Sequence, residues 1–142
     1  MQFQYPITLT NDEDTVVAQI VDIPEAITFG DDKEHALHEA QDALIVALAM
    51  YVDDRRIIPT GSKPKRGQPV VSLTPLLAAK VALHNALMQS KTTNVALAEL
   101  MGLRENQVRR MLDIDHRSHI GQIEQGLKLL GYELITTAKK VA

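Results

Sequence analysis

The sequence predicts an α+β fold in two parts, a β-β-β-α-β domain over residues 1–73 and an all-α domain with a short C-terminal strand over residues 74–142. Three observations support this prediction. Apolar and polar residues alternate near the start of the chain, apolar residues recur every three or four positions further on, and a segment rich in proline and glycine lies between the two halves.

The first half begins with a predicted hairpin. Apolar residues alternate with polar ones over residues 3–9, which is typical of a half-buried strand. A polar turn at residues 11–14 then leads to a second strand over residues 15–21.

A third strand and a long helix are expected next. Residues 26–29 form the short strand, which Gly30 ends. Asp31 or Asp32 then caps a helix over residues 33–52, whose apolar side chains step by three and four and would cover the sheet.

The boundary between the halves follows a loop or linker at residues 57–70, which holds three prolines and two glycines. A last strand is expected at residues 70–73. Thr74 can then cap a new helix that begins at Pro75, where the missing N–H of proline costs nothing.

The charges divide unevenly between the halves. Residues 1–74 hold six Lys and Arg against twelve Asp and Glu, whereas residues 75–142 hold nine against six. The basic half can approach phosphate and the acidic half suits a basic protein, although short domains also vary by a few charges. With no cysteine and no long apolar run, we expect a soluble, cytoplasmic protein without a membrane partner.

The first half offers four carboxylates that could form a catalytic or metal site, Asp22, Glu25, Asp31 and Asp32. Cap and turn chemistry explains all four, so we expect no enzyme activity, no catalytic residue, no metal and no cofactor. His35 and His38 are interpreted as solvated, because no further ligand follows at a useful spacing.

The helix predicted at residues 75–90 carries two apolar stripes. One holds Leu76, Ala79, Leu83, Ala86 and Leu87, and the other holds Leu77, Val81, His84 and Met88. Since a small domain buries one stripe in its own core, the second predicts contact with another subunit.

The next segment has the spacing of a helix-turn-helix. Thr93 caps a short helix, Ala98 lies where two helices would cross, Gly102 supplies the positive φ of the turn, and Val108 anchors the second helix. An ordinary helical hairpin has the same pattern. The outward residues favour DNA, since they combine donors for guanine, amides for adenine and charges for phosphate: Arg104, Glu105, Asn106, Gln107, Arg109 and Arg110.

The remaining candidates for DNA contact are Thr93 and three residues of the following loop, Arg117, Ser118 and His119. Ser118 is also the expected cap of a helix that runs to Leu130. The strand-like residues 132–137 would pair with a second copy in a dimer or tetramer and space two recognition helices about one DNA turn apart.

With these features in view, the whole chain resembles the HicB antitoxins that carry a C-terminal helix-turn-helix. The matching segments are residues 5–9 (Tyr-Pro-Ile-Thr-Leu), 21–26 (Val-Asp-Ile-Pro-Glu-Ala), Thr28, Gly30-Asp31, 34–37, 97–112 and 129–131.

The resemblance implies functions for both halves. The first would adopt a partial ribonuclease-H-like fold without the catalytic carboxylates, and would cover the active site of a small basic toxin similar to HicA, which cleaves mRNA. The second, similar to phage repressor domains, would bind operator DNA and repress the toxin–antitoxin operon, with the toxin as co-repressor or de-repressor. Asp22, Glu25, Asp31 and Asp32 are the predicted toxin contacts.

Two other functions stay open at this point. One is a helix-turn-helix regulator whose first half senses a small molecule. The other is an RNase-H-like nuclease, which would cleave nucleic acid with magnesium.

Overall fold

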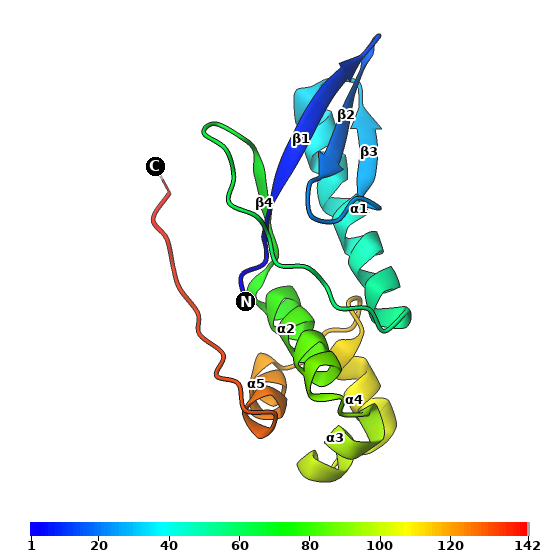
Figure 1. Ribbon diagram of the computed structural model, residues 1–142, viewed down its shortest axis with the longest axis vertical. Coiled ribbons are helices and arrows are strands. Elements are labelled where there is room, and N and C mark those ends of the chain that lie inside the picture. Colours follow the sequence, from blue (N-terminus) through cyan, green and yellow to red (C-terminus); the bar gives the residue numbers. More distant parts are fainter. Residues whose placement is uncertain (142) are drawn as a thin grey trace. The chain divides into compact units, whose positions relative to one another are not determined.

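The computed structural model describes residues 1–141, and the chain divides into two compact units, Met1–Leu73 and the part that begins at Thr74. Figure 1 shows the strands gathered in the first unit with one helix, and the other helices in the second. The predicted α+β class is confirmed.

The N-terminal unit is built on an antiparallel sheet with the strand order β3-β2-β1-β4 among the described residues. Its strands are β1 (Gln4–Asp12), β2 (Thr15–Ile20), β3 (Ile27–Gly30) and β4 (Val70–Ser72). Register places Ile7 opposite Ile20 and Tyr5 opposite Val71, and all four side chains are buried. Apolar residues two apart therefore share the face that forms the core.

Helix α1 (Lys33–Asp53) covers one face of this sheet (Figure 1). Asp32 is its N-cap, and the carboxylate accepts a hydrogen bond from the His35 N–H at 2.8 Å. Gly30 is required just before the helix, because a Cβ there would lie 2.4 Å from the backbone nitrogen of Ala36. The strand therefore passes directly against the first turn of α1.

The proline-rich segment is a loop tied to the sheet. The Tyr5 hydroxyl donates to the carbonyl of Pro59 at 2.8 Å, and the Gly61 N–H donates to Gln2 at 3.2 Å. Ile58 is 1 % exposed, so the loop also contributes to the core. These contacts make the segment part of the N-terminal unit.

The C-terminal unit consists of α2 (Pro75–Ser90), α3 (Asn94–Met101), α4 (Glu105–Leu112) and α5 (Ile120–Leu129). Thr74 caps α2 as expected, accepting from the Leu77 N–H. The core holds Leu83, Leu97, Val108, Met111 and Ile123, each at most 1 % exposed.

The second apolar stripe of α2 does not lie open for another subunit, which corrects the prediction. Val81 is fully buried and His84 is 2 % exposed within the single chain. Leu77 and Met88 at the ends of the stripe are half-buried. The helix is enclosed on both sides, so its two stripes give no argument for a subunit contact.

One prediction about the end of the chain is also wrong. Helix α5 begins at Ile120 with His119 as its N-cap, so Ser118 is not the cap. Residues 132–141 form no strand in the single chain. Pairing of this segment with a second copy stays a prediction.

Candidate functional site

The first candidate site is the α3–α4 pair of the C-terminal unit. The Thr93 hydroxyl accepts from the Ala96 N–H at 3.0 Å and so caps α3. Gly102 ends α3 with a φ of 68°, and the Leu103 N–H then donates to the carbonyl of Ala98 at 2.8 Å. Ala98 is 4 % exposed. The small residue and the turn glycine hold the places that the sequence indicates.

Helix α4 has one buried and one polar side. Its apolar residues Val108, Met111 and Leu112 are buried, as predicted. Four of the six predicted contact residues are exposed, namely Arg104, Asn106, Arg109 and Arg110, while Glu105 and Gln107 are half-buried. The polar side is therefore accessible along the whole helix.

Some polar side chains of α4 have hydrogen-bond or ion-pair partners within the unit, and others have none. Arg109 pairs with Glu105 one turn away at 2.8 Å, and the Gln107 side-chain oxygen accepts from the Arg104 N–H at 2.9 Å. Within the described part of the chain, the side chains of Asn106 and Arg110 make no hydrogen bond or ion pair with another side chain. These two are the side chains that α4 offers to a ligand.

A buried lysine, which sequence reasoning missed, holds the loop after α4. Lys80 is 1 % exposed, and its ammonium donates to the carbonyls of Arg110 (3.1 Å) and Asp113 (2.6 Å) and to the Ser118 hydroxyl (2.9 Å). Burial lowers the pKa of Lys80. The available signal was a lysine between Ala79 and Val81 in an otherwise apolar run of α2.

This contact changes the interpretation of Ser118. Its hydroxyl lies 3.2 Å from the Arg110 carbonyl and 3.1 Å from Nδ1 of His116, besides accepting from Lys80. Ser118 therefore fixes the loop, and its hydroxyl is occupied within the unit.

A cleft of about 150 Å³ lies between α4 and the start of α5. It brings together five of the predicted DNA-binding residues, Gln107, Arg110, Arg117, Ser118 and His119, and adds His116 and Gln122. The other five predicted residues do not line it: Thr93, Arg104, Glu105, Asn106 and Arg109. Arginine, histidine and amide side chains around a small opening make a site suited to an anion such as phosphate.

In the N-terminal unit, three of the four predicted carboxylates accept hydrogen bonds from the chain itself, namely those of Asp22, Glu25 and Asp32. Asp22 accepts from both the backbone N–H (2.8 Å) and the hydroxyl of Ser62. Glu25 accepts from the Tyr51 hydroxyl at 2.7 Å and lies 3.4 Å from Arg56, whose guanidinium also stacks on the Tyr51 ring. The hydrogen bond from Tyr51 is the main cause that lowers the pKa of Glu25.

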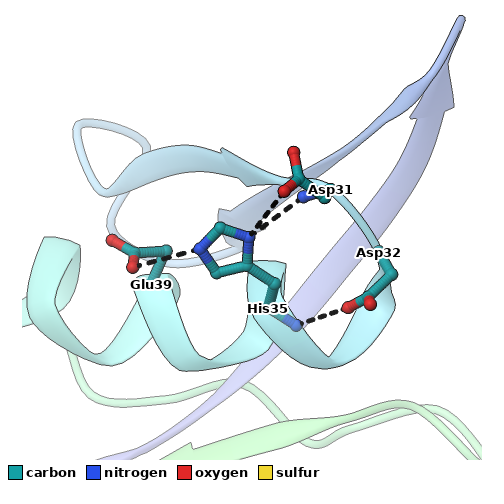
Figure 2. A network of polar contacts seen from close by, with 4 residues as sticks. All are labelled: Asp31, Asp32, His35 and Glu39. Atoms are coloured by element: carbon teal, nitrogen blue, oxygen red, sulfur yellow. Dashed lines mark hydrogen bonds and ion pairs between the residues drawn. The ribbon is translucent and has the colours of Figure 1, made fainter.

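Asp31 and Asp32 lie around His35, as Figure 2 shows. Nδ1 of His35 accepts from the Asp31 N–H at 3.1 Å, and Nε2 lies 3.4 Å from Glu39. His35 and His38 are both exposed, as predicted for solvated side chains, and His35 in addition has a partner at each ring nitrogen. The Asp31 carboxylate, 94 % exposed, is the freest of the four.

Comparison with known proteins gives consistent matches. Residues 4–82 match the family model described as HicB-like antitoxin of bacterial toxin–antitoxin systems. The chain is 40 % identical to antitoxin HicB 2 of Photorhabdus laumondii over 92 % of this chain and 93 % of that one. It is 36 % identical to antitoxin HicB of Pseudomonas fluorescens (98 % and 96 %) and 34 % identical to antitoxin HicB of Escherichia coli K12 (92 % and 96 %).

The chain belongs to the HicB antitoxin family. This confirms the resemblance to HicB antitoxins that was drawn from the sequence. Among residues 1–141, no helix is long and apolar enough to cross a membrane.

Proposed function

We propose that this HicB protein neutralises a small basic, mRNA-cleaving toxin similar to HicA through its N-terminal unit, and represses the toxin–antitoxin operon through its C-terminal unit. Family membership supports the first activity, together with an N-terminal half that has twice as many acidic as basic residues. The strand order β3-β2-β1-β4, with α1 between β3 and β4, supports a partial ribonuclease-H-like fold. The unit acts by covering the toxin and has no catalytic role of its own.

The single observation that carries the DNA-binding proposal is the polar side of α4. We interpret α3 and α4 as a helix-turn-helix with α4 in the major groove, where Asn106 and Arg110 read base edges. Thr93 and Arg104, at the N-terminal ends of α3 and α4, would meet the DNA backbone.

The cleft beside α4 extends this interface. Arg117 and His119 flank the first turn of α5, whose backbone N–H groups favour an anion. A phosphate held there would set the register of α4 on the duplex, because phosphate contacts position a protein and base contacts specify the sequence.

The test is Arg110→Ala in operator binding. We expect affinity for the operon's own upstream DNA to fall roughly 10- to 100-fold, the range for one lost base contact. Toxin neutralisation, measured as growth rescue on co-expression, should be unchanged. Lys128→Ala serves as the control, because it removes an exposed positive charge from α5 of the same unit.

Equal loss of both activities in Arg110→Ala would contradict separate roles for the two units. An operator affinity equal to that of the wild type would exclude α4 as the recognition helix.

We also propose that the protein acts as a dimer or larger oligomer, joined by pairing of residues 132–137 with the same segment of a second copy. Exposed Ile135, at 74 %, supports a partner for this segment. A monomeric mass by light scattering at micromolar concentration would exclude it.

A further inference from the structure

A groove of about 320 Å³ runs along the N-terminal unit between β3 and α1. Its apolar side chains are Ile27, Val46 and Met50, and its carboxylates are Glu25, Glu39 and Asp42. We refer to it as the β3–α1 groove. Of the four predicted toxin contacts, Glu25 alone lines this groove.

The apolar side chains of the groove are open to solvent. Ile27 is 54 % exposed, Val46 62 % and Met50 48 %. Val46 and Met50 are four residues apart and so share one side of α1, whereas Leu44 and Leu48 on the neighbouring side fill the core. A second apolar stripe outside the core suggests a surface that a partner covers.

The charged side chains that line the groove are all acidic, although Glu25 also pairs with Arg56 outside the lining. Three carboxylates line the groove, and no lysine or arginine does. The hydrogen bond from Tyr51 lowers the pKa of Glu25, so this carboxylate is ionised and held in place at neutral pH. Asp42 has no side-chain partner within residues 1–141, which leaves its charge available.

We propose that the β3–α1 groove is the docking surface for the basic toxin, which places an apolar side chain over Ile27, Val46 and Met50 and surrounds it with lysine or arginine facing Glu39 and Asp42. This inference rests on the proposed toxin neutralisation and names the face that carries it out. An apolar centre with a charged rim of opposite sign matches how stable protein interfaces are built. The groove thereby replaces the set Asp22, Asp31 and Asp32, of which Asp22 and Asp32 are occupied inside the unit.

The test measures the affinity of the full-length chain for the purified toxin of the same operon by calorimetry. We expect Asp42→Lys to weaken binding by roughly 30-fold or more, because it sets like charges against each other in the interface. Val46→Gln should weaken it about 10-fold by removing a buried apolar contact. Raised salt should weaken the wild type more than Asp42→Lys.

Two matched controls separate the groove from general effects. Asp14→Lys makes the same change of net charge in the exposed β1–β2 turn, and Phe29→Gln removes an exposed apolar side chain of β3 that lies outside the groove. Both should bind the toxin as the wild type does. Thermal melts check that each variant is folded, and Asp42→Asn, with a smaller expected loss of about 3-fold, replaces Asp42→Lys if that variant is unfolded.

The outcomes are distinct. A wild-type chain that does not bind the toxin overturns the proposed function itself. Toxin binding that survives Asp42→Lys and Val46→Gln, or that is lost only in Phe29→Gln, overturns the groove and leaves the proposed function standing. A lower oligomer mass of both groove variants would assign the groove to a second copy of this chain and overturn the proposal as well.

Discussion

The two units of this HicB protein use their candidate polar residues in opposite ways. In the N-terminal unit, the carboxylates of Asp22, Glu25 and Asp32 each accept a hydrogen bond from a group of the same unit. In the C-terminal unit, the side chains of Asn106 and Arg110 are exposed on α4. The hydrogen bonds that hold the two ends of this helix are made by Lys80 and Gln107.

The two units differ in which side chains form hydrogen bonds with backbone N–H and carbonyl groups. Asp32 accepts from the His35 N–H in the first turn of α1, where an unmet donor is costly, and Asp22 accepts from the Ser62 N–H of the loop. At the C-terminal end of α4, Lys80 of another helix satisfies the carbonyls of Arg110 and Asp113. The side chain of Arg110 takes no part in these contacts, whereas that of Arg109 pairs with Glu105.

Among the substitutions that test this difference, replacing Lys80 should lower the unfolding free energy most. Lys80→Met keeps the length of the buried side chain but removes its hydrogen bonds to the carbonyls of Arg110 and Asp113, which should cost roughly 2–4 kcal/mol of unfolding free energy. Operator affinity should fall as well, because the loop with Arg117 and His119 loses its anchor. Urea unfolding of the full chain and operator titration measure the two effects.

Lys128→Met is the matched control for Lys80→Met. Lys128 pairs with Glu124 on the exposed surface of α5, where solvent screens the two charges and the pair contributes little to stability. If both variants unfold at the same urea concentration, Lys80 does not anchor the loop.

A smaller loss of unfolding free energy is expected when the hydrogen bond between Tyr51 and Glu25 is removed in the N-terminal unit. Tyr51→Phe removes the hydrogen bond to Glu25 and should cost about 1 kcal/mol at neutral pH. Since the folded-state pKa of Glu25 is lowered from its ordinary 4.5, this stabilisation is complete above 4.5 and is lost as pH falls through the lowered value. The unfolding free energies of Tyr51→Phe and wild type should therefore converge in acid.

Tyr132→Phe provides the control for the pH dependence. The Tyr132 hydroxyl donates to the neutral Gln89 side chain at 2.7 Å. Loss of this hydrogen bond should therefore lower the unfolding free energy equally at neutral pH and in acid. A difference between Tyr51→Phe and wild type that persists unchanged in acid would contradict the role of the ionised Glu25.

Sequence reasoning predicted the features that depend on neighbours in the chain. Thr74, Thr93 and Gly102 act within one helical turn, so their cap and turn roles follow from spacing alone. Lys80 could not be assigned, because its three acceptors lie 30 to 38 residues away and are brought together by packing of α2. The same reason hid the β3–α1 groove, which joins residues of a strand to residues of a helix.

The smallest change in stability is expected from two adjacent aspartates, Asp31 and Asp32, whose carboxylates differ in their contacts. Asp32→Ala removes the N-cap of α1 and should cost about 1 kcal/mol, whereas Asp31→Ala should unfold with the wild type, because its carboxylate is 94 % exposed and 3.9 Å from His35. Both changes remove one negative charge, so net charge cannot explain a difference in urea midpoint. If Asp31→Ala instead weakens toxin binding without a change in stability, this free carboxylate belongs to the docking surface, and the surface extends beyond the β3–α1 groove to the start of α1.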